Sequence, residues 1–86
     1  MKRDLDLVRR IMRDAEALPP GRLGSDFNYE GKEEAETLEH VALLVQAGYL
    51  EGIISRDSKG MPRKCLIRRV TWQGHEFLAN GKSDSI

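Results

Sequence analysis

The chain has 86 residues, of which 40% are hydrophobic and 6% aromatic, a composition that fits one small domain with a mainly aliphatic core. Its 14 basic and 14 acidic residues cancel, which excludes a protein that attracts polyanions over its whole surface. Cys65 is the single cysteine, so an internal disulfide is excluded. No apolar run approaches the roughly 20 residues that span a bilayer. We therefore expect a cytoplasmic protein with no membrane partner.

The first predicted element is a helix over residues 3 to 18. Its apolar residues recur at three- and four-residue steps, which places them on one face. They include Leu5, Val8, Met12 and Ala15. Pro19 and Pro20 end this helix, because proline cannot donate to the backbone ladder and disfavours helical geometry in the residue before it.

The following segment, residues 21 to 32, is predicted to be a connector. Phe27 and Tyr29 alternate with polar neighbours, and this pattern predicts a strand of about three or four residues. Such a strand would add an edge to the hairpin that comes later in the chain.

A second helix is predicted over residues 33 to 47, and Gly48 is predicted to end it in a left-handed conformation with Tyr49 folding back on Leu44. Its expected core stripe follows helical spacing. The stripe contains Ala35, Leu38, Val41, Ala42, Val45 and Tyr49. The positions expected on its solvent side are Glu33, Glu36, Thr37, Glu39 and His40. Leu43 lies off the stripe and is expected to offer an apolar contact to a partner.

Two strands, residues 50 to 54 and residues 66 to 70, are predicted to pair as a hairpin. The polar interval between them, residues 55 to 65, contains glycine and proline and is predicted to be a flexible loop. Charge is segregated along the chain: residues 55 to 69 sum to +5 and residues 26 to 39 to −5. The hairpin is therefore the basic part of the molecule.

Thr71 is predicted to cap a last helix over residues 72 to 80. Trp72 has two interpretations, a stacking platform for a base and a core residue, and its place at a strand-to-helix junction favours the core. We expect one domain over residues 1 to 81 and a flexible tail over residues 82 to 86.

This order of elements predicts a small α+β domain of the winged-helix type. It would have three helices, a β-hairpin as the wing and a third short strand in the connector. A winged helix carries one more helix before its recognition position, and here only the connector stands there. The missing helix is the one that crosses the DNA backbone, so the fold would be a reduced version.

Three segments of the chain resemble an uncharacterised family common in bacteria and their phages, the domain-of-unknown-function family 2513. They are MKRDLDLVR at residues 1 to 9, EHVALLVQAGYL at residues 39 to 50, and VTWQGHEFL at residues 70 to 78. The resemblance implies a phage or bacterial origin and a shared architecture. It implies no activity, because the family has none established.

No catalytic residue, metal or cofactor is expected. His40, His75 and Cys65 show neither an HxxxH nor a CxxC spacing. The carboxylates of residues 30 to 39 lie on a solvated helix face, where nothing apolar would shift a pKa. The glycines follow neither a dinucleotide-binding nor a phosphate-loop pattern. These features favour a non-enzymatic protein.

The basic hairpin is the strongest functional indication in the sequence. Its side chains are expected to contact the phosphates of double-stranded DNA. They are Arg56, Lys59, Arg63, Lys64, Arg68 and Arg69. The simpler interpretation is a solvated loop that protects a sheet edge. The acidic second helix argues against insertion into the major groove, because carboxylates repel phosphates.

Two functions therefore stay open. The first is a DNA-binding regulatory protein of a phage or prophage that contacts the backbone through the hairpin. The second is a protein-interaction module with a host or phage partner and no DNA binding. The second helix would offer Thr37, His40 and Leu43 as its surface. The sequence specifies neither the target nor the oligomeric state.

Overall fold

The structure, a computed structural model, describes residues 4–84, with side chains described for residues 4–80. It contains three helices and a two-stranded antiparallel sheet. The elements are α1 (Leu5–Glu16), α2 (Glu34–Gln46), β1 (Leu50–Arg56), β2 (Pro62–Val70) and α3 (Trp72–Asp84). The predicted α+β class, with three helices and a hairpin, is confirmed.

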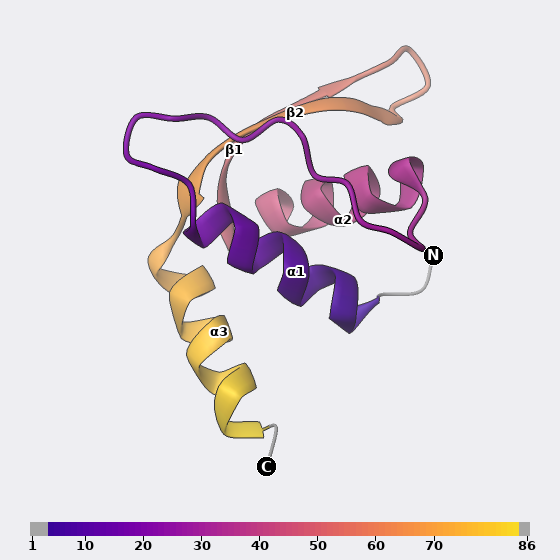
Figure 1. Cartoon of the computed structure of the whole chain (residues 1–86). Helices are drawn as coiled ribbons and strands as arrows, with labels where there is room; N and C mark the ends of the chain where they lie inside the picture. The colour runs from indigo at the N-terminus through magenta and orange to yellow at the C-terminus, as the bar shows by residue number, and fades with distance from the viewer. Residues whose placement is uncertain (1–3, 85–86) are drawn as a thin grey trace.

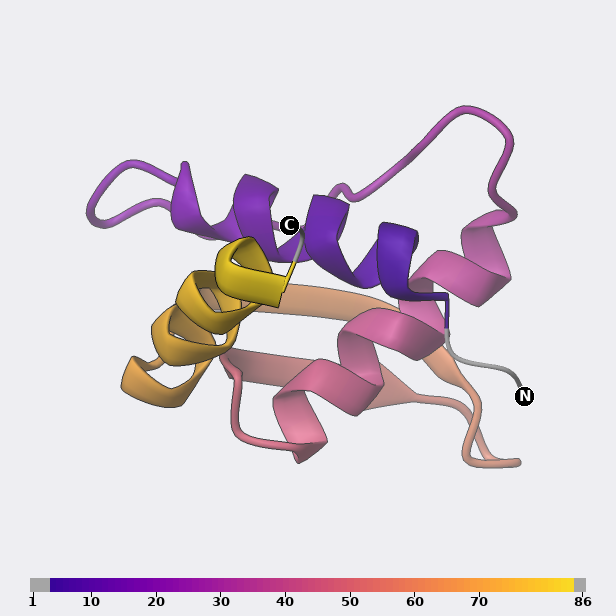
Figure 2. The ribbon, with the colours of Figure 1, turned by 90° about the horizontal axis from the view of Figure 1, so that it is seen from below.

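The helices α1 and α2 lie on one side of the hairpin, and α3 runs away from the end of β2 (Figure 1; Figure 2). The core forms between these layers, where α2 contacts both strands and α1 contacts β2. Its fully buried apolar side chains are Leu7, Ile11, Met12, Val41 and Ile67. No helix within residues 4–84 has the length and apolar character needed to cross a membrane.

The helix α1 is two residues shorter at each end than predicted. Asp4 caps its start, where its side chain accepts a hydrogen bond of 3.1 Å from the Leu7 amide. The helix ends before the prolines, and Leu18 is half-buried beyond its end. Leu5, expected in the core row, is 56% exposed because it lies at the first helical position, outside the hairpin contact.

The predicted end of α2 at Gly48 is confirmed. Gly48 has a φ of +85°, and its amide donates to the Val45 carbonyl at 3.1 Å. The Tyr49 amide donates to the Leu44 carbonyl at 2.9 Å, which completes a Schellman cap. The Tyr49 ring stacks on Phe77 of α3 at a centroid distance of 5.1 Å, so the cap also joins two helices.

The buried face of α2 differs from the predicted stripe. Thr37 and His40, expected on the solvent side, are each 1% exposed, whereas Ala35 is exposed. The helix is rotated by about one position, because hydrogen bonds inside the domain satisfy both polar side chains and remove the cost of burying them. Leu43 is 37% exposed, as expected.

The hairpin is longer and its loop shorter than predicted. The strands extend to Arg56 and begin again at Pro62, so only residues 57–61 form the loop. The predicted loop residue Cys65 lies in β2, opposite Ile54, and is 4% exposed. The prediction of a long flexible loop was wrong, because basic side chains on the strand's outer face made that stretch look like a turn.

The third strand is one isolated bridge, and it lies outside the predicted residues. Gly24 exchanges two hydrogen bonds of 2.8 Å with Ile67 of β2, whereas residues 27–29 form no strand. Phe27 is instead buried in the core. The Tyr29 hydroxyl donates to Asp14 of α1 at 2.6 Å. Burial and this carboxylate both raise the pKa of Tyr29.

The helix α3 begins as predicted and continues to Asp84, beyond the expected residue 80. Thr71 caps it, because its hydroxyl oxygen accepts from the Gly74 amide at 3.1 Å. Trp72 is 79% exposed, so its assignment to the core was wrong. Residues 85–86 lie outside the described residues, and the domain boundary at residue 81 stays a prediction.

Candidate nucleic-acid interface

The loop at the tip of the hairpin is organised by Asp57. Its Oδ1 accepts hydrogen bonds of 2.9 Å from the amides of Lys59 and Met61. Its Oδ2 lies 3.0 Å from Arg63 Nε, which donates to it. These bonds, led by the Met61 amide, hold the pKa of Asp57 below its usual range. The tip is therefore an ordered turn on which the basic side chains have defined positions.

The six basic residues of the hairpin differ in how they are occupied. Arg56 donates to the Gly60 carbonyl at 2.9 Å, and Arg63 forms an ion pair with Asp57. Arg68 and Arg69 both lie against Glu51, at 3.5 and 3.3 Å. Among the side chains of residues 4–80, Lys59 and Lys64 form no ion pair, and both are exposed. Of the six basic side chains, these two lysines are therefore the ones held neither by a carboxylate nor by a backbone carbonyl.

The structure separates the basic residues into two groups. Arg56, Lys59, Arg63 and Lys64 lie at the tip, whereas Arg68 and Arg69 lie at the far end of β2. Strand geometry places positions 64 and 68 about 13 Å apart along the strand. The predicted patch is therefore a line along the hairpin, interrupted by Leu66.

A basic residue that sequence reasoning missed joins the second group. Arg22 of the connector lines a groove of about 690 Å³ together with Arg68, Arg69 and His75. The bridge between Gly24 and Ile67 holds this part of the connector against β2. Arg22 is the single basic residue between the two prolines and Phe27, which is the signal that could have identified it.

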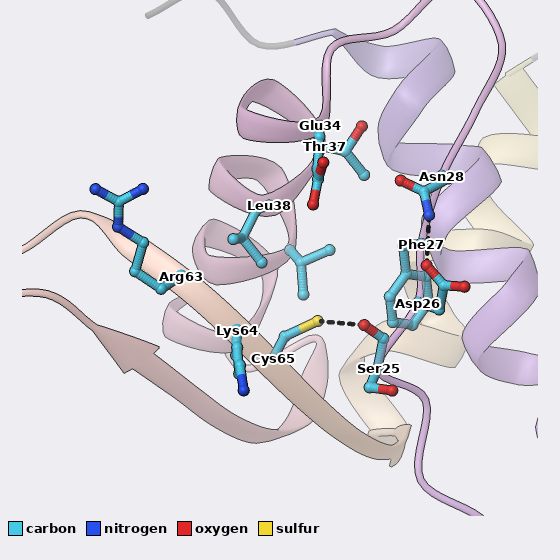
Figure 3. A pocket seen from close by; sticks show the side chains of 11 residues that line it. Ser25, Asp26, Phe27, Asn28, Glu34, Thr37, Leu38, Arg63, Lys64 and Cys65 are labelled. Atoms are coloured by element: carbon cyan, nitrogen blue, oxygen red, sulfur yellow. Dashed lines mark hydrogen bonds between the residues drawn. The ribbon is translucent and has the colours of Figure 1, made fainter.

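A second pocket, of about 390 Å³, lies between the connector, α2 and β2 (Figure 3). Asp26 and Glu34 line it together with Arg63 and Lys64, and Phe27 supplies apolar surface. The Cys65 thiol donates to the Ser25 carbonyl at 3.9 Å, and burial raises the pKa of this thiol. A thiol held in its neutral form is a poor nucleophile. The pocket can accept a polar group of either charge.

The predicted surface of the second helix is mostly inside the molecule. His40 Nδ1 donates to the Glu36 carbonyl at 2.8 Å, and His40 Nε2 accepts from the Asp4 amide at 3.0 Å. Thr37 donates to the Glu33 carbonyl at 3.0 Å. Both ring nitrogens of His40 are therefore used in hydrogen bonds, and neither is open to a partner or a metal. Leu43 alone of the three predicted residues reaches the surface.

The start of α1 is tied to the connector as well as to α2. The Asp4 carboxylate forms an ion pair with Lys32, and this hydrogen bond is the main cause that lowers the pKa of Asp4 and raises the pKa of Lys32. Asp4 thus makes three contacts: its side chain caps α1 and pairs with Lys32, and its backbone amide donates to His40. The junction fixes α2 relative to α1 and so orients the acidic start of α2.

Comparison with known proteins assigns the chain to a family. Residues 2–86 match the family described as hypothetical protein (DUF2513). The chain belongs to this family. An uncharacterised protein of Haemophilus influenzae is 35% identical to this DUF2513 protein over 96 residues, which cover 100% of the chain and 72% of the relative. No solved structure matches the chain.

One of the segments that resemble the DUF2513 family, residues 70 to 78, has a clear structural role in this member. Thr71 caps α3 and also donates to the Gly48 carbonyl. Gly74 is buried against the Tyr49 carbonyl, and Leu78 lies in the core. These residues hold α3 to the end of the hairpin. Trp72 is the exception, because it belongs to the segment and points into solvent.

Proposed function

We propose that this protein is a cytoplasmic, non-enzymatic DNA-binding regulatory module of the phage or prophage type. It contacts the phosphates of double-stranded DNA through the hairpin. The observation that carries the proposal is a pair of exposed lysines, Lys59 and Lys64, on a turn ordered by Asp57. Neither lysine has an acidic partner among the side chains of residues 4–80. Lysines with no acidic group to displace release condensed counterions from DNA at the lowest cost.

The arrangement of the chain supports contact through the hairpin and not through α2. Residues 17–33 contain no helix, so α2 lacks the neighbour that braces a recognition helix on the DNA backbone. Glu33 and Glu34 are exposed at the start of α2 and repel phosphates. The bridge of Gly24 to β2 supports the winged-helix analogy, since it puts the connector on the far side of β2 from β1.

The test is the salt dependence of binding to duplex DNA of mixed sequence. Fluorescence anisotropy should show binding that weakens as salt rises. Converting Lys59 and Lys64 together to alanine should flatten the slope of log affinity against log salt by up to about 1.8, at ~0.9 for each lost phosphate contact. This change leaves Arg63 on Asp57, so the turn is kept.

The matched control removes the same charge elsewhere. Arg9 and Arg13 are exposed on α1, away from the hairpin, and their replacement with alanine should leave the slope within experimental error. If the wild-type protein is not retained by DNA even at low salt, the proposal fails. If both double variants flatten the slope equally, binding depends on the total charge of the protein, and the hairpin is not the DNA contact.

A protein-interaction module is the second candidate, and the exposure of Trp72 favours it. Its indole Nε1 donates to Glu76 at 2.6 Å, which holds a 79% exposed ring in one orientation. Tryptophan is enriched among residues that dominate binding energy at interfaces. A partner that co-purifies with the wild-type protein should be lost with Trp72→Ala and kept with the Lys59→Ala, Lys64→Ala variant. The reverse pattern would contradict this candidate.

A further inference from the structure

The outer face of the hairpin, which points away from α1 and α2, carries an uncovered apolar surface. Ile53 and Leu66 are cross-strand partners there and are 66% and 44% exposed. Leu23 of the connector, 53% exposed, lies beside them, and the three side chains line one hollow of about 210 Å³. We call these three residues the outer patch.

The strand sequences show that the outer patch departs from an ordinary solvated face. A sheet with one face in water alternates apolar and polar residues. Here Ile53 and Ile54 are consecutive in β1, and Leu66 and Ile67 are consecutive in β2. Ile54 and Ile67 supply the inner face, so their neighbours Ile53 and Leu66 are apolar without serving the core of the chain. The pattern is that of a sheet covered on both faces.

We propose that the outer patch packs face to face on the same patch of a second copy of the chain, around a two-fold axis. Such an interface is isologous, so the surface must complement itself. Glu51 lies against Arg68 and Arg69 at the edge of the patch, which gives that edge both signs of charge. The formal net charge of zero also removes overall repulsion between copies.

The edges of the sheet argue against the other way of joining hairpins, which is to add a strand. The outer edge of β2 is occupied by Gly24. The register of the hairpin shifts between Glu51 and Gly52 and again between Ser55 and Arg56, and each shift leaves one residue of β2, Arg68 or Arg63, without a partner in β1. Two such bulges bend β2 and increase the twist of the whole hairpin, which makes the edge of β1 a poor template for a further strand. The face of the hairpin, and not its edge, is therefore the surface that a second copy covers.

The test is the mass of the protein in solution over a concentration series. Sedimentation should show the 9.8 kDa chain passing to twice that mass, over a range from roughly 1 to 500 µM that brackets weak association. Ile53→Lys and Leu66→Lys should each weaken dimerisation at least about 100-fold, because each change occurs twice in the interface. Met61→Lys is the control, since Met61 is 47% exposed in the loop and lies outside the outer patch.

Three outcomes would overturn the proposal. The first is a wild-type protein that stays monomeric over the whole range, which would leave the outer patch to a different partner. The second is a dimer that Ile53→Lys disrupts and Leu66→Lys does not, because that pattern belongs to pairing through the edge of β1. The third is an equal effect of Met61→Lys.

Circular dichroism of the monomeric variants separates dissociation from unfolding, and their helix signal should equal that of the wild type. Leu23→Lys provides a third variant outside both strands, so the proposal stays testable if a strand variant fails to fold. None of these measurements involves DNA. Failure of the dimer and failure of DNA binding are therefore distinguishable.

Discussion

Gly74 is the residue with the least room for a side chain. A Cβ atom there would overlap the Tyr49 carbonyl oxygen and lie 2.6 Å from Val70 Cγ1 and 2.9 Å from Met12 Cε. The Tyr49 carbonyl is backbone and Val70 is a short, branched core residue, so neither can move aside cheaply, and only the flexible end of Met12 could shift. The close approach of α3 to the start of β1 depends on this glycine.

We expect Gly74→Ala to destabilise the domain by about 2 kcal/mol or more, the cost of overpacking a filled core. For a domain of this size the melting midpoint should fall by roughly 10 °C, which a thermal scan measures. Gln73→Ala, one residue earlier and exposed, is the control and should stay within about 0.5 kcal/mol. An unchanged midpoint for Gly74→Ala would mean that α3 does not dock on the hairpin as described.

Single residues also show why the sequence misplaced part of the candidate site. Thr37 and His40 are polar, and a pattern of polar residues predicts solvent. Their burial depends on partners that sequence spacing does not reveal, above all the Asp4 amide, 36 positions before His40. For Trp72 the error is the opposite one, because an apolar ring predicts burial, whereas its indole Nε1 donates to Glu76 at the surface and Leu78 and Phe77 pack on the core instead.

At the scale of elements, the helices and the hairpin could be predicted because each carries its own local signals. The glycine stop of α2, the aspartate cap of α1 and the threonine cap of α3 act within a few residues of the helix end. The full extent of β2 could not be predicted, because the exposed Arg63 and Lys64 hide the buried positions Pro62 and Cys65 at its start. The polar residues at the start of β2 were therefore assigned to the loop.

The hairpin loop depends on the carboxylate of Asp57. Asp57→Asn keeps the shape of the side chain and removes its charge, so the bonds to Lys59, Met61 and Arg63 weaken together. We expect faster amide hydrogen exchange at Lys59 and Met61, with exchange in the core strands unchanged. Nuclear magnetic resonance measures both.

Ser58→Ala is the control for this loop, since it changes a neighbouring exposed side chain and keeps Asp57. If Asp57→Asn leaves both amides protected, the turn is held by its backbone bonds and the left-handed Gly60. In that case the lysines would keep their positions without the aspartate.

For the whole molecule, the Asp4 and Lys32 ion pair predicts a dependence of stability on pH. The pKa of Asp4 is lowered in the folded state by Lys32 and the Leu7 amide, so its contribution is present above the unfolded pKa and is lost as pH falls through the folded one. The pKa of Lys32 is raised, so its contribution disappears only at strongly alkaline pH. We expect the unfolding midpoint to decline below about pH 4.

Lys32→Met should reduce the part of this acid dependence that arises at Asp4, because the main cause of the lowered pKa is removed. Denaturant unfolding at a series of pH values measures it, and Lys59→Met, which removes a lysine without an ion pair in the described residues, is the control. The same acid profile in all three proteins would show that Asp4 gains nothing from Lys32.

The bridge between Gly24 and Ile67 determines when the domain can fold during its synthesis. A chain emerges from the ribosome starting at its N-terminus, and α1, the connector and α2 appear before either strand. Their apolar sides are only partly covered until Ile67 and Val70 of β2 are made, and until then Gly24 of the connector has no strand to pair with. The domain therefore closes only after β2 has been synthesised, and until then the nascent chain exposes the surfaces that chaperones bind.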